Sequence, residues 1–362
     1  MPIHVLIISP ALAKGGMERQ LSIFLKNYDR NRIKVTLALL ENNIKYDLPD
    51  DIEVIQLNRR FSGDPLFYIH LIRHLLKRDY DLINSKISGV NELIFLFCGL
   101  LGKEHVIAEV RNTGVALKKY HQRMASLLKI FRKDWWVVCN SKLAKAEVSQ
   151  ILPPDTRVFF IGNGIDTHSF YKLPAKQEAT SFKIGYAGRI TKQKNLETLI
   201  HAVAKLSDSV PDVNLLLQGT SPNEEYLTQL HTLVKDLHMQ KNIFFFEQNE
   251  IPLLQYYNNL DLFVLPSFFE GTPNALLEAM SCGCVCVCSK EANTDSFLEG
   301  TYTFEASSIK GLVNRLCTFA DMSSAQKQLI SERNQNFVRS NYSMDNMVNQ
   351  LTSLYEQKMS GA

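Results

Sequence analysis

The sequence has 362 residues, 45% of them hydrophobic and 21% charged, which fits two soluble globular domains. The formal net charge of +3 is too small to indicate a nucleic-acid-binding protein. Seven cysteines without a regular spacing argue against a secreted, disulfide-bonded scaffold and favour a reducing compartment.

The N-terminal residues Met1–Lys14 contain an apolar run with no basic stretch before it. This arrangement indicates a first buried strand rather than a signal peptide. The longest apolar run, Leu93–Leu101, is about half of the roughly 20 residues that a membrane-spanning helix needs. We therefore expect a cytoplasmic protein without a transmembrane segment.

Short apolar runs alternate with longer runs of helical periodicity along the whole chain. The expected strands are Ile3–Ser9, Ile33–Leu40, Ile52–Leu57, Asp81–Asn84, His105–Val110, Trp135–Cys139, Val158–Ile161, Phe182–Ala187, Val213–Gln218, Asn242–Phe246, Leu262–Leu265 and Cys284–Cys288. The expected helices include Met17–Tyr28, Pro65–Lys77, Val115–Lys133, Leu196–Lys205 and Glu224–Leu237. Many of the strands are apolar throughout, as parallel strands covered on both faces are. The alternation predicts an α/β fold with doubly wound parallel sheets.

Each half of the chain begins with an apolar strand, a glycine-containing turn and a helix. The sequence turns polar at Gly162–Lys176, which places a domain boundary there. Ligands of open α/β sheets bind beyond the carboxyl ends of the strands. We therefore expect the active site in a cleft between two such sheets.

The strongest local motif is Glu270–Ala279, which follows the apolar strand Leu262–Leu265. Thr272 is a good N-cap, and a proline is favoured at the first helical position, so a helix is predicted to begin at Pro273. Its free amides and dipole favour a phosphate. Glu270 and Glu278 can accept hydrogen bonds from sugar hydroxyls. Alternatively, Glu270 caps its loop and Glu278 is a solvated helix residue.

Two further motifs follow the first strand of each half. In Gly185–Asn195 a strand ends in a glycine turn, and Arg189 and Lys194 flank a helix start. A diphosphate needs two cationic partners when no metal is present, although a solvated basic loop would look the same. In Lys14–Glu18 the pair Gly15-Gly16 allows close approach of a ligand to the backbone, or forms a simple turn.

The three motifs, in this order and at these strand ends, resemble glycosyltransferase family 4, a family of retaining enzymes with the two-domain GT-B fold. The family's E-x7-E signature matches Glu270 and Glu278. Val138–Ser141 is similar to a strand and turn of the family's first domain, and Ile161–Asp166 to its interdomain segment. Met344–Lys358 is similar to the C-terminal helix that returns to the first domain. The resemblance implies an acceptor-binding domain, 1–165 with about 342–362, and a nucleotide-sugar-binding domain, 166–341.

The resemblance also implies roles for individual residues. Arg189 and Lys194 would bind the diphosphate and stabilise the charge on the leaving nucleotide. Glu270 would face the donor sugar, and Glu278 would hold the ribose hydroxyls. The donor-binding residues would be Gly15, Gly16, Gly188, Gln218, Gly219, Gly271, Thr272, Pro273, Asn274, Ala275 and Glu278. No cofactor and no metal are expected, since the chain has no convincing D-x-D motif.

Two positions depart from the family pattern. Arg111 stands where relatives often carry a histidine near the donor sugar. An arginine cannot act as a base, so Arg111 would bind a hydroxyl or a phosphate and favours a catalytic role in charge stabilisation over proton transfer. Alternatively, it pairs with Glu109 or another carboxylate. The stretch Ser289–Asp295 replaces a Gly-Gly pair and a glutamate, so the donor-side loop is expected to differ.

Cysteines 282, 284, 286 and 288 alternate along a predicted strand. Zinc sites more often use a C-x2-C spacing, and cysteine packs well as a small buried hydrophobe. We therefore interpret these four cysteines as core residues rather than metal ligands.

A basic stretch with apolar residues at helical spacing lies between Leu117 and Lys133. It predicts either an amphipathic helix on an anionic membrane surface or a core-facing helix with a solvated charged side. Its cations are Lys118, Lys119, Arg123, Lys129, Arg132 and Lys133.

The resemblance therefore implies a metal-independent, retaining glycosyltransferase that moves a hexose or N-acetylhexosamine to a lipid-linked or polysaccharide acceptor in cell-surface glycan or lipopolysaccharide biosynthesis. UDP is the expected carrier because it is the commonest in the family. A peripheral position at the inner face of the membrane is compatible with the expected cytoplasmic location. Two alternatives remain: a non-catalytic nucleotide-sugar-binding subunit, and a nucleotide-sugar epimerase or hydrolase on the same fold. A Rossmann dehydrogenase is disfavoured because no G-x-G-x-x-G follows a strand.

Overall fold

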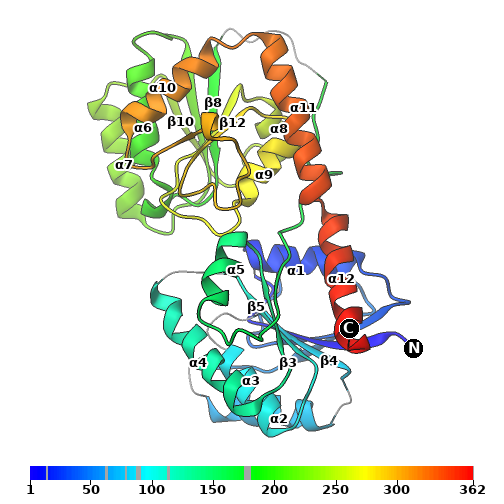
Figure 1. The fold of residues 1–362 in the computed structure, drawn as a ribbon. Coiled ribbons are helices and arrows are strands. Elements are labelled where there is room, and N and C mark those ends of the chain that lie inside the picture. Colours follow the sequence, from blue (N-terminus) through cyan, green and yellow to red (C-terminus); the bar gives the residue numbers. More distant parts are fainter. Residues whose placement is uncertain are drawn as a thin grey trace. The chain divides into compact units, whose positions relative to one another are not determined.

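The computed structural model describes residues 1–13, 15–61, 64–77, 80–86, 91–111, 115–174 and 181–361. These residues form two compact domains (Figure 1). The N-terminal domain comprises Met1–Gly164 and Met344–Ala362, and the C-terminal domain comprises Ile165–Ser343. Each domain is a parallel sheet flanked by helices, so the predicted α/β class is confirmed.

The N-terminal domain contains a seven-stranded parallel sheet of order β3-β2-β1-β4-β5-β6-β7. Its central strands are buried along most of their length, because their residues are apolar on both faces. The strands are β1 (Ile3–Ser9), β2 (Ile33–Leu39), β3 (Glu53–Gln56), β4 (Leu82–Ser85), β5 (Val106–Val110), β6 (Trp136–Cys139) and β7 (Val158–Phe160).

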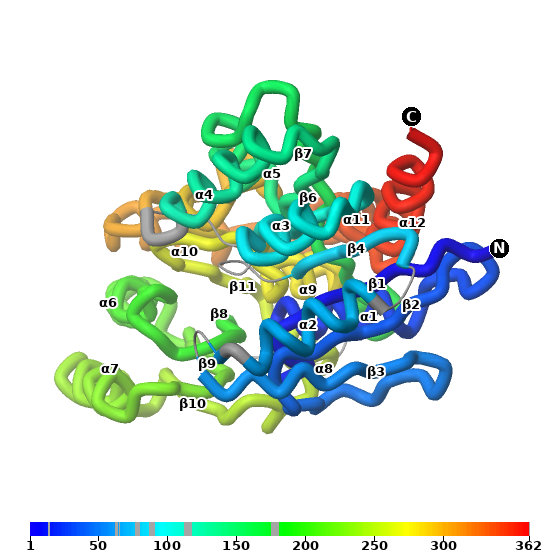
Figure 2. Tube along the Cα trace, turned by 90° about the horizontal axis from the view of Figure 1, so that it is seen from below, coloured from blue at the N-terminus to red at the C-terminus, as the bar shows by residue number. Residues whose placement is uncertain are grey.

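Helices cover both faces of this sheet. One face packs on α2 (Pro65–Lys77), α3 (Asn91–Leu100), α4 (Val115–Phe131) and α5 (Lys142–Ser149). The other face packs on α1 (Gly16–Asn27) and α12 (Met344–Ser360). The last helix of the sequence, red in Figures 1 and 2, therefore completes the core of the N-terminal domain by packing beside α1.

The C-terminal domain contains a six-stranded parallel sheet of order β10-β9-β8-β11-β12-β13. Its strands are β8 (Phe182–Ala187), β9 (Val213–Gln218), β10 (Ile243–Phe246), β11 (Leu262–Leu265), β12 (Cys286–Ser289) and β13 (Thr303–Phe304). Its helices are α6 (Leu196–Leu206), α7 (Glu224–Asp236), α8 (Leu253–Asn258), α9 (Asn274–Ser281), α10 (Ile309–Ala320) and α11 (Ser324–Asn341), with short 3₁₀ turns at Lys192–Lys194 and Gly300–Tyr302.

The four clustered cysteines are buried with free thiols, as the interpretation as core residues requires. Only Cys286 and Cys288 lie in β12, however, because Cys282 is the C-cap of α9 and Cys284 lies in the connection that leads to β12. The prediction of one alternating strand through all four was therefore wrong. Burial raises the pKa of the Cys282 thiol to about 12, so this thiol is protonated at neutral pH.

Across the described residues, no helix is both long and apolar enough to cross a membrane.

Candidate functional site

The order of the strands marks one position in each sheet where the chain reverses direction across the sheet. In the N-terminal domain β2 lies on one side of β1 and β4 on the other. In the C-terminal domain β9 and β11 flank β8 in the same way. Such switch points leave a crevice beyond the carboxyl ends of the two strands, where open α/β sheets bind ligands. All three sequence motifs begin at these strand ends.

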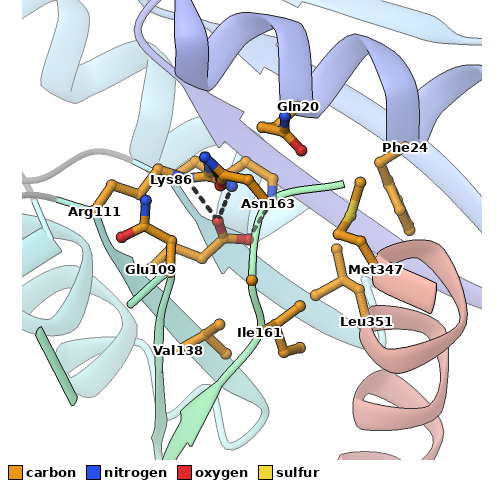
Figure 3. Close-up of a pocket in the computed structure, with 12 residues that line it drawn as sticks. Gln20, Phe24, Lys86, Glu109, Arg111, Val138, Ile161, Asn163, Met347 and Leu351 are labelled. Atoms are coloured by element: carbon orange, nitrogen blue, oxygen red, sulfur yellow. Dashed lines mark hydrogen bonds and ion pairs between the residues drawn. The ribbon is translucent and has the colours of Figure 1, made fainter. Parts of the chain in front are cut away.

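In the N-terminal domain the switch point contains a cluster of charged side chains. Lys86 directly follows β4, Glu109 lies near the end of β5, and Arg111 follows that strand. Lys86 Nζ pairs with Glu109 Oε1. Arg111 binds the other carboxylate oxygen, with Nη2 at 2.7 Å and Nε at 3.1 Å from Glu109 Oε2 (Figure 3). The pairing of Arg111 with Glu109, one of the two alternatives from the sequence, is therefore present.

Burial and mutual attraction determine the ionisation of this cluster. The side chains of Lys86 and Glu109 are 2% and 5% exposed. Burial lowers the pKa of Lys86 to about 8, although Glu109 opposes the shift. Burial would raise the pKa of Glu109, but the charges and hydrogen bonds of Lys86 and Arg111 outweigh it and lower that pKa to about 2. Both side chains are therefore charged at pH 7.

The cluster is linked to the segment that leads out of the N-terminal domain. Asn163 Oδ1 lies 3.5 Å from Arg111 Nη1. The buried amide of Gln20, on α1, donates to the carbonyl oxygen of Gly164 at 3.0 Å and accepts from its N–H at 2.7 Å. These contacts surround a small cavity of about 20 Å³, which Figure 3 shows with its lining side chains.

The glycine motif of this domain forms the start of α1. Gly15 is the N-cap with an extended backbone and no side-chain cap, and α1 begins at Gly16. Both glycines are exposed, and the first N–H groups of a helix have no partner within the helix. Lys14, the first residue of the predicted motif, lies outside the described residues.

In the C-terminal domain, Lys194 and Glu270 form a nearly buried ion pair at the β8–β11 switch point. Lys194 Nζ lies 2.5 Å from Glu270 Oε1, with side-chain exposures of 13% and 10%. Ser267 Oγ donates to the same oxygen at 2.6 Å. Two residues that are 76 positions apart in sequence are thus brought into one site. Lys194 is not the solvated loop residue of the alternative interpretation, whereas Arg189 is exposed.

The glycine turn after β8 makes a close backbone contact. Gly188 adopts φ +148°, a conformation that other residues rarely adopt. A Cβ atom built on Gly219 would lie 1.8 Å from the carbonyl oxygen of Gly188. The N–H of Gly188 also donates to the carbonyl oxygen of Gln218 at 3.0 Å. Glycine at position 219 is therefore required for the turns after β8 and β9 to pack together.

The side chain of Gln218 is engaged within the protein. Its amide donates to the carbonyl oxygen of Ile251 at 2.9 Å and accepts from the N–H of Ile251 at 3.1 Å. Gln218 therefore fixes the loop after β10, and this contact was not predicted from the sequence.

The start of α9 differs by one residue from the prediction. The helix begins at Asn274, and Pro273 is the N-cap with ψ 83°. The N–H of Asn274 binds the carbonyl oxygen of Thr272 at 3.0 Å in a local turn, and the N–H of Leu277 binds that of Pro273. The prediction of Thr272 as the N-cap was wrong, because the backbone of Pro273 is not helical. The amides of Asn274 and Ala275 lie in the first turn.

Glu278 lies inside α9 and is buried at 3% exposure. The hydroxyl of Tyr257 donates to Glu278 Oε2 at 3.0 Å. The alternative that Glu278 is a solvated helix residue is therefore wrong.

The stretch that departs from the family pattern supports the loop before α9. Ser289 Oγ donates to the carbonyl oxygen of Ser267 at 2.5 Å, and Thr294 Oγ1 donates to that of Gly271 at 2.8 Å. The loop that carries Glu270 is thus held from both sides.

Sequence reasoning missed Lys86, Gln20, Asn163 and Tyr257. Only Lys86 carried a signal, since it is a lone lysine directly after a buried strand on the edge where ligands bind. Within the described ranges, no group of three or more histidine, cysteine, aspartate or glutamate side chains is placed to hold a metal ion.

Comparison with known families identifies both halves of the chain. Residues 14–169 match the profile of Glycosyltransferase Family 4, and residues 169–336 match that of Glycosyl transferases group 1.

Two curated bacterial relatives are similar over most of the chain. A Campylobacter jejuni N-acetylgalactosamine-N,N'-diacetylbacillosaminyl-diphospho-undecaprenol 4-alpha-N-acetylgalactosaminyltransferase is 25% identical, covering 77% of this chain and 78% of its own. An Escherichia coli UDP-Gal:alpha-D-GlcNAc-diphosphoundecaprenol alpha-1,3-galactosyltransferase is 22% identical, covering 79% of this chain and 78% of its own.

Solved structures share the fold of the whole chain. A glycosyltransferase from Rickettsia africae has a TM-score of 0.84 at 16% identity, covering 100% of both chains. Anabaena HepE in complex with UDP has a TM-score of 0.82 at 18% identity, covering 99% of this chain and 100% of its own. The fold is therefore that of the GT-B glycosyltransferases.

Proposed function

The chain belongs to glycosyltransferase family 4, and from that premise we propose that it is a retaining, metal-independent transferase acting on a lipid-linked acceptor. The donor is a nucleotide-sugar, with UDP as the carrier and a hexose or N-acetylhexosamine as the sugar. The carrier is supported by the UDP named for the Escherichia coli relative and the Anabaena structure. The acceptor class is supported by the diphosphoundecaprenol compounds named for the two relatives.

The observation that carries the proposal is the Lys194–Glu270 pair at the β8–β11 switch point. In the reaction the bond between the sugar's anomeric carbon and the diphosphate breaks, and a bond to the acceptor hydroxyl oxygen forms. Lys194 and the exposed Arg189 would neutralise the charge that develops on the departing diphosphate. The N–H of Ala275, in the first turn of α9, would add a hydrogen-bond donor.

The acceptor hydroxyl would attack on the face from which the diphosphate leaves, and its proton would pass to the diphosphate. This path retains the anomeric configuration and needs no protein nucleophile. Glu270, held by Lys194 and Ser267, would accept hydrogen bonds from the donor sugar. Glu278, oriented by Tyr257, would accept those of the ribose.

Nucleotide release tests this proposal. The protein would be incubated with UDP-, GDP- and ADP-sugars and a bacterial lipid extract, with and without a chelator. We expect one UDP-sugar to release its nucleotide at the same rate in both conditions, because Lys194 and Arg189 supply the positive charge. Tight binding of one donor without release in the presence of a suitable acceptor would instead support the non-catalytic subunit. Loss of release with the chelator would contradict metal independence.

We also propose that the N-terminal domain contacts an anionic membrane through the predicted cations of α4, together with exposed apolar side chains of α2, which packs on the same face of the sheet. The apolar side of α4 packs in the core, where Met124 and Leu128 are buried. The cations of α4 therefore remain at the surface, where Ile130 of the same helix is also exposed. Further large apolar side chains are exposed on α2, at Leu66, Ile69 and Leu76. Cations with exposed apolar groups suit a membrane surface.

Vesicle flotation tests this contact. Replacing Lys118, Lys119, Lys129 and Arg132 by glutamine is expected to weaken binding to phosphatidylglycerol vesicles at least a hundredfold, since each cation contributes about 1 kcal/mol. The matched control replaces the exposed lysines 205, 235, 241 and 310 of the C-terminal domain by glutamine. Equal loss of vesicle binding in both variants, or unchanged vesicle binding in the first, would exclude α4 as the contact.

A further inference from the structure

The charged cluster at the β1–β4 switch point has an excess of positive charge. The Glu109 carboxylate pairs with two cations: Lys86 binds its Oε1 atom and Arg111 binds its Oε2 atom. The formal charge of the three side chains is therefore +1. Tyr355, on α12, also faces them, but burial raises its pKa well above the usual value and it stays neutral. A positive excess among these paired groups attracts an anionic group that approaches the guanidinium from outside.

Only one member of the cluster is placed to reach a ligand. Lys86 and Glu109 are 2% and 5% exposed, whereas Arg111 is 15% exposed. The adjoining cavity of about 20 Å³ has room for about one water molecule and none for a phosphate or a sugar. A ligand can therefore meet the guanidinium of Arg111 from outside but cannot reach the Lys86–Glu109 pair.

We propose that this cluster is a subsite for an anionic group of the substrate, in which Arg111 makes the contact and Glu109 and Lys86 are positioning residues. The ligand group is an oxyanion, either a phosphate or the carboxylate of an acidic sugar. Both fit the planar guanidinium, which binds such groups through two parallel hydrogen bonds. The inference rests on the proposed transferase function, because it assigns the group to that enzyme's substrates.

The contacts explain the two positioning roles. Glu109 Oε2 holds Arg111 through both Nε and Nη2, which fixes the plane of the guanidinium. Asn163 approaches its Nη1 atom. Lys86 binds the other carboxylate oxygen of Glu109. Its positive charge offsets the negative charge of Glu109, so the cluster keeps the net positive charge of Arg111. Without Lys86 the remaining pair is formally neutral, so its attraction for an anion falls.

The test compares affinities by calorimetry for UDP, a neutral UDP-hexose and a UDP-hexuronic acid. We expect Arg111→Gln to weaken binding of whichever of these ligands carries the bound oxyanion by about tenfold to a hundredfold, as loss of a charge-assisted contact does. Lys86→Met is expected to weaken it about tenfold. The matched control is Arg32→Gln, which breaks the ion pair between Arg32 and Glu356 of α12. Arg32 directly precedes β2, so it lies at the amino-terminal ends of the strands, away from the proposed subsite.

The pattern among ligands identifies the source of the anion. Equal weakening for all three ligands assigns the subsite to the donor phosphate, and weakening for the UDP-hexuronic acid alone assigns it to a sugar carboxylate. A higher KM for a diphosphate-linked acceptor, with unchanged donor affinities, assigns it to the acceptor phosphate. Unchanged affinities and acceptor KM in folded Arg111→Gln would overturn the inference. If Lys194→Ala still lowered kcat/KM for transfer, the proposed function would stand nevertheless.

A pH profile separates this role from simple packing. Lys86 loses its proton as the pH rises through about 8, which takes the cluster from +1 to 0. Affinity for the anionic ligand should therefore fall above that pH in the wild-type protein. The step should be absent in Lys86→Met, which is neutral at every pH. A wild-type affinity that is constant from pH 7 to 9.5 would contradict the charge argument.

Discussion

Replacing Lys194 by alanine is expected to lower kcat/KM for the donor by about 10²–10³-fold, the usual effect of removing one group that stabilises transition-state charge. The same change leaves Glu270 nearly buried without its cation, which destabilises the fold by about 3–5 kcal/mol. Steady-state kinetics and urea unfolding would measure the two effects separately.

A double variant separates chemistry from folding. Adding Glu270→Gln to Lys194→Ala removes the unpaired buried charge, so much of the lost stability should return. Because Glu270 is itself proposed to bind the donor sugar, kcat/KM is compared with that of Glu270→Gln alone, and we expect it to be lower in the double variant. Lys192→Ala, two residues earlier and exposed, is the matched control and should change kcat/KM much less. Recovery of activity together with stability in the double variant would show that Lys194 is only structural.

Replacing Gly219 by alanine is expected to lower the free energy of unfolding by about 3 kcal/mol, at the upper end of what overpacking costs. The new Cβ would lie 1.8 Å from the carbonyl oxygen of Gly188, so two backbone segments must separate. These segments form the turns after β8 and β9, and donor affinity should fall as well. Urea unfolding and UDP calorimetry would measure the two changes.

Gly300→Ala is the matched control for this substitution. A Cβ at Gly300 meets no heavy atom within 4 Å, and its backbone is not left-handed. Its effect on unfolding should stay within about 0.5 kcal/mol, as is usual for surface positions. A Gly219→Ala protein as stable as Gly300→Ala would mean that the two turns do not pack as described.

The order of strands and helices could be predicted because each buried strand is a short, continuous apolar run that is visible in the sequence. A parallel strand covered on both faces, such as β1 or β9, is a continuous apolar run that is hard to mistake. Weaker elements lacked that signal. β13 has only two residues, Thr303 and Phe304, and is defined by its pairing with β12. The start of α9 depends on the backbone of Pro273, which residue preferences did not reveal.

Contacts between distant residues account for what sequence reasoning missed in the site. The sequence placed Lys194 and Glu270 in separate motifs, and only the sheet order brings them together. Gln218 was predicted at the end of a strand, but its bonds to Ile251 depend on where the next loop returns. Lys86 directly follows β4 and Glu109 lies in the neighbouring strand β5, and their pairing follows from the register of these two strands.

The transfer itself is the most direct test of the central proposal. A UDP-sugar with a labelled α-anomeric carbon would be incubated with the protein and a polyprenyl-diphosphate-linked acceptor, and the anomeric configuration of the product read by NMR. The proposal predicts an α-linked sugar on the lipid, formed about 10²–10³-fold more slowly by Lys194→Ala. A β-linked product, or label found only as free sugar, would contradict retaining transfer.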